Sequence, residues 1–299
     1  MKRTARSGYS GRRSEKARMP LMYDAVRLVF VVLLCGMLAL IIQETWLDYR
    51  DYAALERTRQ LMASVTPTPV PPATPAPTPK PITTKSPTAP PPPTPTPRVY
   101  VISSRFSTLL AQNPDTIGWI TIADTPIDYP VVQSDDNEHY LHISFDGNES
   151  KAGTLFLDYR CEITSEFPPH FIIYGHHMKN GSMFKALMRF KEKDFFSSHR
   201  TFRFDTLYED MEWEIFSAYV TEAVDPYIRT RFDSDEEWLA FLNDRHARSM
   251  HATPDITLSQ DDIVLTLSTC TYEFKDARFV VHARLVRDAR PPQDAGSAP

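Results

Sequence analysis

The stretch Asp262-Ile-Val-Leu-Thr-Leu-Ser-Thr-Cys270, followed eight residues later by Arg278 and Phe279-Val-Val-His-Ala-Arg-Leu285, indicates how this chain folds. Six of the seven residues at 263–269 are β-branched or aliphatic, and none is Gly or Pro, which predicts a strand ending at Cys270. The second run predicts a neighbouring strand, joined to the first by the loop 271–277. Its alternation places Arg278 on the same face as Val280, His282 and Arg284.

Two such strands would hold the Cys270 thiol within reach of the Arg278 guanidinium. A cationic neighbour favours the thiolate and can stabilise an oxyanion, so Cys270 is a candidate nucleophile. On these two residues alone, a buried cysteine beside a surface arginine is the more frequent arrangement, because free cysteine is among the most buried residue types. The catalytic interpretation therefore depends on a third group.

Length and charge limit the function classes. The 299 residues leave room for one catalytic domain and accessory segments. Residues 1–27 carry eight basic and two acidic side chains, a net of +6, so the overall −5 leaves −11 for the rest and argues against a nucleic-acid partner. Cys35, Cys161 and Cys270 lack CxxC spacing, which predicts neither a zinc site nor a disulfide framework, and no cofactor is expected.

An apolar segment follows the basic N-terminus. Residues 28–43 carry no charge, and Arg27, Trp46 and Leu47 can extend the segment toward the ~20 residues that a spanning helix needs. We expect a basic cytoplasmic tail at 1–27, a transmembrane signal anchor at 28–47, and everything beyond it outside the cell membrane. A cleaved signal peptide is the competing interpretation, which residues 43–48 disfavour because they form a poor small-x-small cleavage site.

Composition divides the remainder. Residues 48–65 lack Gly and Pro and predict a helical stalk. A Pro/Thr-rich linker at 66–98, which holds 15 of the 26 prolines, predicts a semi-rigid polyproline II spacer whose threonines are candidates for glycosylation. The catalytic domain is expected at 99–290 and a disordered tail at 291–299.

The domain is predicted to be mainly β, a closed barrel of about eight strands with inserted helices. Helices are expected at 106–110, 183–190 and 234–246, the last capped by Ser234 with Glu237 completing a capping box. Apolar runs between turn residues predict strands within 113–122, 127–133, 153–157, 171–174, 202–204, 212–220, 263–270 and 278–286.

The strand at 171–174 ends in Tyr174-Gly-His-His-Met178. A histidine at a strand end is more often structural when it stands alone. A cysteine nucleophile, however, needs an acid or base partner and a group that binds the developing oxyanion. A histidine and Arg278, at separate strand ends, can fill those two roles.

These residues carry a resemblance to the sortase family, and within it to class B. The resemblance covers roughly residues 105–287. The long segment before the cysteine strand, which contains the 234–246 helix, resembles class B enzymes more than the smaller class A enzymes. The motifs that carry it are Tyr174-Gly-His-His-Met178 with Asn180-Gly-Ser-Met-Phe184, Thr266-Leu-Ser-Thr-Cys270 with Arg278, Asn113-Pro-Asp-Thr-Ile-Gly-Trp-Ile120, Tyr129-Pro-Val-Val-Gln133, Asp136-Asn137 with Tyr140-Leu141, and Gly153-Thr-Leu-Phe-Leu-Asp158.

The resemblance implies a sortase-type barrel and a cysteine transpeptidase on the outer face of a Gram-positive bacterium. Cys270 would attack a threonine carbonyl in the C-terminal sorting motif of a secreted protein, and an amine of a peptidoglycan precursor would resolve the thioester. His176, directly after the glycine, would protonate the leaving amine, and Arg278 would bind the substrate carbonyl or the oxyanion. Ser268 would line the substrate groove, and His177 is interpreted as a neighbour.

Several alternatives stay open at this point. Position 271 is Thr and the nearest acidic side chain is Glu273, so no carboxylate is assigned as a third group. A non-catalytic, membrane-anchored protein that binds sorting peptides is the alternative function. A pilin-polymerising enzyme and a hydrolytic cysteine peptidase are the others, although the order of His before Cys is the reverse of the papain-like one.

Overall fold

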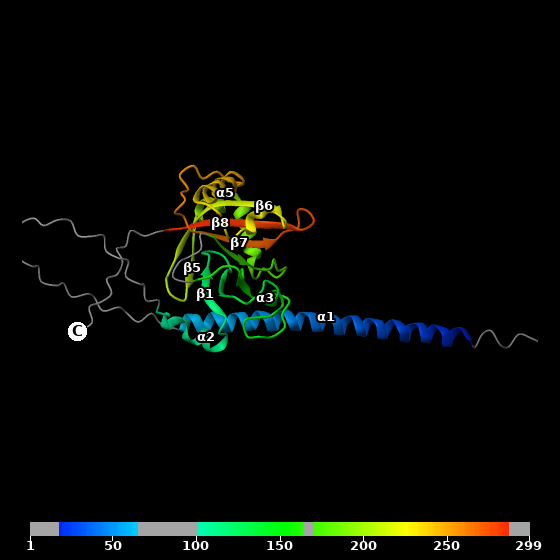
Figure 1. The fold of residues 1–299 in the computed structure, drawn as a ribbon. Helices are drawn as coiled ribbons and strands as arrows, with labels where there is room; N and C mark the ends of the chain where they lie inside the picture. The colour runs from blue at the N-terminus through cyan, green and yellow to red at the C-terminus, as the bar shows by residue number, and fades with distance from the viewer. Residues whose placement is uncertain (1–17, 65–100, 164–169, 287–299) are drawn as a thin grey trace, which may run out of the picture. The chain divides into compact units, whose positions relative to one another are not determined.

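The computed structural model describes residues 18–64, 101–163 and 170–286 (Figure 1). The linker predicted at 66–98 and the tail at 291–299 lie outside these residues, as does most of the basic tail. The chain forms two compact units, Met1–Tyr52 and Ala53–Pro299. Each unit is described by itself.

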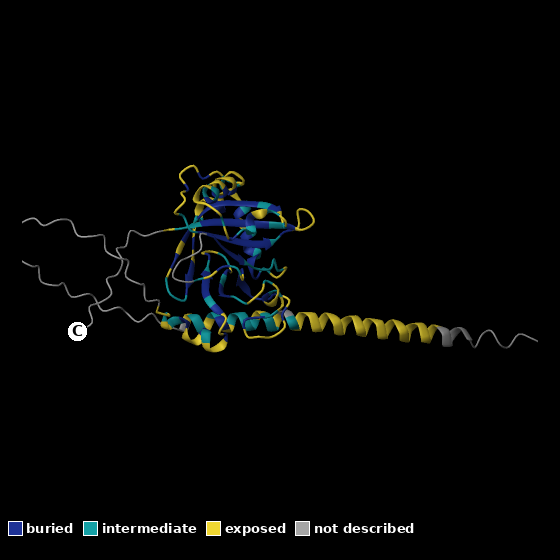
Figure 2. Cartoon of the chain, in the orientation of Figure 1, coloured by how far each residue is buried: buried dark blue, intermediate teal, exposed yellow. Residues whose placement is uncertain are grey.

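Helix α1 (Arg18–Ser64) is continuous over 47 residues and joins the predicted anchor and stalk in one element. Among the described residues it is the one helix long and apolar enough to cross a membrane, over Tyr23–Ala63. Its aliphatic side chains in the first unit are exposed (Figure 2). A side-chain surface of this kind is suited to lipid.

In the second unit, the last turns of α1 contact the barrel. The Arg59 Nε donates to the carbonyl of Asp128 at 3.0 Å, and its guanidinium lies 4.8 Å from the centre of the Tyr129 ring. Leu55 packs against the main hydrophobic core. Residues 53–64 are thus an added helical layer on the domain.

Eight strands close into a barrel in the order β1-β2-β3-β4-β7-β8-β6-β5, with β1 also paired to β5. This confirms the predicted fold class. The strands are β1 (Thr116–Thr121), β2 (Asp128–Val132), β3 (Leu155–Leu157), β4 (His170–Tyr174), β5 (Thr201–Thr206), β6 (Glu212–Glu222), β7 (Val264–Cys270) and β8 (Ala277–Leu285).

Two parallel pairs, β2 with β3 and β4 with β7, interrupt an otherwise antiparallel barrel. The β4–β7 register aligns Tyr174 with Ser268, so both strands end at the same rim. The β7–β8 hairpin then returns the chain with Cys270 opposite Arg278. The rim therefore collects the end of β4, the end of β7 and the start of β8.

Alternation on β7 and β8 decides which side chains enter the barrel. Leu265, Leu267, Phe279 and Val281 are fully buried in the main core. The opposite face of β7 and β8 is also buried, and the β6–β7 connection covers it.

The strands β1 and β5 approach each other closely. A Cβ on Gly118 would lie 2.4 Å from the Asp205 carbonyl oxygen, so this position requires glycine.

The helical segments are η1 (Ser104–Phe106), α2 (Ser107–Gln112), α3 (His139–His142), η2 (Phe184–Lys191), α4 (Lys193–Ser198), η3 (Pro226–Ile228) and α5 (Asp235–Ala247). The three predicted helices are present, although 184–191 is a 3-10 helix. Ser234 caps α5 by accepting from the Glu237 N–H at 3.2 Å. The expected capping box is incomplete, because the Glu237 carboxylate accepts from the Asp233 N–H and from Arg229.

Candidate active site

Cys270 is the last residue of β7 and is partly exposed at the barrel rim. Arg278 is its direct partner in the β7–β8 register. Residues opposite each other in an antiparallel pair have Cβ atoms roughly 4.5–5.5 Å apart on one face of the sheet. The hairpin thus sets Arg278 directly across from Cys270, and the Arg278 Nη1 donates to the Ala277 carbonyl at 3.1 Å.

His176 lies two residues beyond the end of β4. The Gly175 N–H donates to the Ser268 carbonyl at 3.1 Å, so the β4–β7 alignment continues one residue past β4, and His176 follows at the rim where β7 ends in Cys270. A Cβ at position 175 would lie 2.3 Å from the Leu155 side chain and 2.7 Å from the Phe184 ring. Glycine before the histidine is therefore a packing requirement.

The ring of His176 is oriented by α3. Its Nε2 lies 2.9 Å from the Leu141 carbonyl oxygen, which can only accept. Nε2 therefore carries a proton in both the neutral and the cationic ring, and Nδ1 is the atom left to exchange protons. This partner could not be predicted from the sequence, because a backbone carbonyl in a four-residue helix has no sequence signature.

Ser268 is buried, and its hydroxyl lies 2.9 Å from the Tyr227 hydroxyl. Tyr227 belongs to η3 in the β6–β7 connection, and its N–H donates to Asp225 at 2.9 Å. Burial raises the pKa of Tyr227, while the nearby charge of Arg278 lowers it and that of Cys270 raises it. Tyr227 therefore belongs to the rim site, although no motif marked it.

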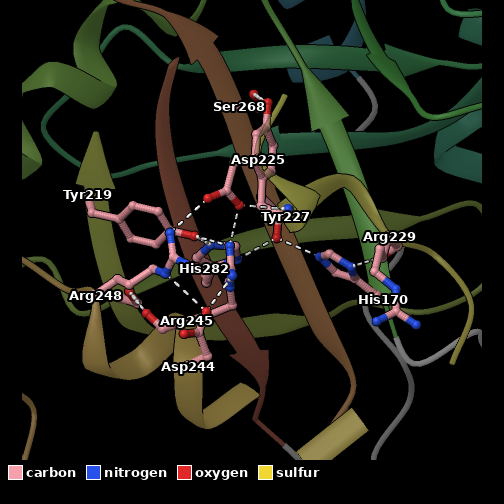
Figure 3. A network of polar contacts seen from close by, with 12 residues as sticks. His170, Tyr219, Asp225, Tyr227, Arg229, Asp244, Arg245, Arg248, Ser268 and His282 are labelled. Atoms are coloured by element: carbon pink, nitrogen blue, oxygen red, sulfur yellow. Dashed lines mark hydrogen bonds and ion pairs between the residues drawn. The ribbon is translucent and has the colours of Figure 1, made fainter. Parts of the chain in front are cut away.

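Behind the site, two fully buried histidines share one hydroxyl (Figure 3). The Thr266 Oγ1 lies 2.7 Å from His170 Nε2 and 2.7 Å from His282 Nδ1. Because the Arg229 carbonyl accepts from His170 Nδ1, Nε2 of that ring must accept from Thr266. Thr266 then accepts from His282 Nδ1, and His282 Nε2 accepts from the Tyr219 hydroxyl at 3.0 Å.

A charged cluster terminates this chain of hydrogen bonds on α5. Arg245 Nη1 donates to the Tyr219 hydroxyl at 3.1 Å and to the carboxylate of Asp225, and Arg245 Nη2 donates to Asp244. Arg248 donates to the other Asp225 oxygen at 2.8 Å. These donor and acceptor assignments hold only while both His170 and His282 are neutral.

The acidic side chain that follows Cys270 most closely in the sequence, Glu273, already has two partners. Glu273 accepts from the Thr271 hydroxyl and forms an ion pair with Lys191. In the described part of the chain, the ring nitrogen contact of His176 is to Leu141 and not to this carboxylate. The third group that orients His176 is therefore a backbone carbonyl.

The other two cysteines lie outside β7, the strand that ends in Cys270. Cys161 is buried, burial raises the pKa of its thiol to about 12, and its Sγ lies 3.5 Å from the His170 carbonyl. Cys35 lies in α1. Within residues 18–64, 101–163 and 170–286, no group of three or more His, Cys, Asp and Glu side chains is arranged to hold a metal ion.

Comparison with known proteins supplies the family. The sortase domain profile matches residues 120–286. Sortase B of Listeria monocytogenes is 40% identical over 177 residues, which are 58% of this chain and 71% of that protein. Sortase B of Staphylococcus aureus is 32% identical over 188 residues, which are 62% of this chain and 76% of that protein.

Solved structures agree with these matches. Sortase B of B. anthracis in complex with AAEK1 superimposes with a TM-score of 0.58 at 41% identity, covering 62% of this chain and 86% of that one. The S. aureus sortase B–substrate complex gives a TM-score of 0.66 at 27% identity and covers 80% of this chain and 98% of that one. The chain belongs to the sortase family of cysteine transpeptidases and resembles its class B members.

Proposed function

We propose that this sortase is a membrane-anchored transpeptidase that cleaves the C-terminal sorting motif of secreted proteins and joins them to an amine of the cell wall. The register that sets Cys270 opposite Arg278, beside the parallel end of β4, carries the proposal. Cys270, Arg278 and the segment that follows β4 all lie at one rim, which supports the roles of nucleophile, oxyanion partner and, for His176, proton donor. These are the three groups that acyl transfer requires.

In the first half-reaction, the Cys270 thiolate attacks the carbonyl carbon of the sorting-motif threonine, and Arg278 donates to the oxygen that becomes negative. The C–N bond then breaks, and the leaving amine takes a proton from Nδ1 of cationic His176. The products are a thioester and a free C-terminal fragment. Nε2 stays bound to Leu141 throughout, which keeps the ring in one orientation.

In the second half-reaction, the cell-wall amine attacks the thioester carbonyl and gives its proton to His176 Nδ1. The C–S bond breaks, which restores the thiolate and the cationic histidine. Arg278 again stabilises the oxyanion. Ser268 is proposed to border the substrate groove, and its contact with the buried Tyr227 hydroxyl would hold it there.

The proposed location follows from α1. Its apolar first part would span the cell membrane with the basic N-terminus in the cytoplasm, and the catalytic domain would face the wall of a Gram-positive cell. Secreted substrates and membrane-bound wall precursors both reach that compartment. No step of the reaction needs a metal or an organic cofactor.

The test is the intact mass of the full chain in detergent micelles after incubation with a panel of sorting-motif peptides, alongside Cys270→Ala. We expect a mass gain equal to the acyl fragment, absent from the variant and discharged by an added amine as a transfer product. Discharge to water alone would indicate a hydrolase. Peptide binding without any adduct would indicate a non-catalytic binding protein.

A further inference from the structure

Next to His176 lies a second histidine whose ring contacts the nucleophilic residue itself. His177 Nδ1 is 2.8 Å from the backbone carbonyl oxygen of Cys270. A carbonyl oxygen only accepts, so Nδ1 carries the proton and donates it. This contact links the end of β4 to the end of β7 beyond the last backbone bond between them.

The register explains why the contact exists. In a strand, carbonyl groups two residues apart point to the same side, so Cys270 O points toward β4 as Ser268 O does. Ser268 O accepts from the Gly175 N–H, and the next bond of this ladder would run from the His177 N–H to Cys270 O. At His177, however, the chain leaves β7 and bridges to Met183. The side chain of His177 supplies the donor that its backbone would have supplied in a longer strand.

Partial burial and nearby positive charges both favour the neutral form of the His177 ring. Its pKa is lowered chiefly by partial burial, with Lys185 and Lys191 opposing a further positive charge, while the bond to Cys270 acts in the other direction. Lys191 is paired with Glu273, and the exposed Tyr272 ring lies 5.0 Å from the His177 ring. Neutral His177 has one proton, and the Cys270 carbonyl fixes that proton on Nδ1.

We propose that His177 is a positioning residue of this sortase, whose Nδ1–H holds the Cys270 carbonyl and so fixes the nucleophile's backbone where the β4 ladder no longer reaches. The inference rests on the proposed role of Cys270. The two adjacent histidines then have separate tasks, because His176 exchanges protons and His177 holds the backbone. Loss of the clamp frees the last peptide of β7 and misaligns the thiol with Arg278.

Three variants separate the donor from the ring. His177→Asn places an N–H donor at the same distance from Cβ as Nδ1, His177→Gln places it one bond farther, and His177→Leu removes it at similar size. All are made in the full chain in micelles, and urea unfolding confirms that each is folded. We expect His177→Leu to lower the single-turnover acylation rate on the order of 10- to 100-fold with little change in KM. His177→Asn should stay within about threefold of the parent, because it restores the bond.

A second readout needs no peptide. The rate of Cys270 alkylation by iodoacetamide, followed by peptide mass mapping that excludes Cys35 and Cys161, should fall in His177→Leu and recover in His177→Asn. Equal rates for the parent and His177→Leu, or equally slow His177→Asn and His177→Leu, would overturn the inference. A parent that is alkylated with this pattern but never acylated would refute the proposed function and leave the clamp standing.

Discussion

Acidification from pH 7 to pH 5 should destabilise the catalytic domain through two histidines remote from the chemistry. His170 and His282 are both fully buried and neutral in the hydrogen-bond chain through Thr266 (Figure 3). Burial lowers the pKa of His170 from 6.5 to about 4 and holds the pKa of His282 well below 6.5. The unfolded chain therefore binds protons in this range that the folded domain excludes.

The direction and size of this stability change follow from the linkage between proton binding and folding. Both pKa values are lower in the folded state, so the stabilisation is complete above about pH 6.5 and is lost as the pH falls toward the folded pKa. Integrating a group with values of 6.5 unfolded and about 4 folded gives a loss of about 2 kcal/mol between pH 7 and 5. His282 shifts in the same direction and adds to this loss, so the total is at least about 2 kcal/mol, a large share of typical domain stability.

The measurement is urea unfolding of the full chain in micelles at half-unit pH steps, followed by tryptophan fluorescence from the buried Trp119, Trp213 and Trp238. The carboxylates of Asp158 and Asp225 do not take up protons between pH 7 and pH 5. Their pKa values are below the ordinary 3.8 despite burial, because arginines pair with them, so they destabilise only at lower pH.

Matched variants show which histidines cause the pH dependence of the free energy of unfolding. His170→Asn and His282→Asn should each remove part of the pH dependence while lowering stability at pH 7, and His139→Asn, at an exposed position, is the matched control. His177→Asn should remove a smaller part of the pH dependence, because the His177 ring is only partly buried. A parent that loses less than about 1 kcal/mol between pH 7 and 5, or single variants that keep its full slope, would refute the assignment of two neutral buried histidines.

The remaining predictions concern the rim. Arg278→Gln should lower the single-turnover acylation rate on the order of 100- to 1,000-fold, with partial recovery in Arg278→Lys, and an unchanged rate would exclude an oxyanion role. Gly175→Ala should cost about 1–3 kcal/mol in urea unfolding because its Cβ would meet Leu155 and Phe184, and a cost near zero would show that this packing yields. Tyr227→Phe should cost about 1 kcal/mol through its lost bond to Ser268 and raise KM for the peptide, whereas an unchanged KM would place Tyr227 outside the groove.

The hairpin that carries the site could be predicted from local pattern. The β-branched run of β7 and the alternation of β8 are short-range signals, and a short connecting loop forces the two strands together, so the pairing of Cys270 with Arg278 followed. The parallel pairing of β4 with β7 joins segments about 90 residues apart, and no local pattern encodes it. The resemblance to sortases supplied His176 before its position relative to Cys270 was known.

Burial of the outer face of β8 could not be predicted. Alternation placed His282 with Arg278 and Arg284, a set that is typical of an exposed face, yet His282 is fully buried. The β6–β7 connection covers that face and brings Arg245 to Tyr219. The short helix α3, which supplies the Leu141 carbonyl to His176, was also missed, because four residues are too few to show helical periodicity.

The outer face of β7 explains why the reactive residue lies at the strand end. Thr266, Ser268 and Cys270 share this face at successive alternate positions. Thr266 is bound by the two buried histidines and Ser268 by Tyr227, so the β6–β7 connection is fixed to the first two positions. At the third position Cys270 stays partly exposed, and its backbone carbonyl is bound by the His177 ring. The buried polar network and the proposed catalytic rim are thus consecutive parts of one strand face, and the network fixes the strand that ends in Cys270.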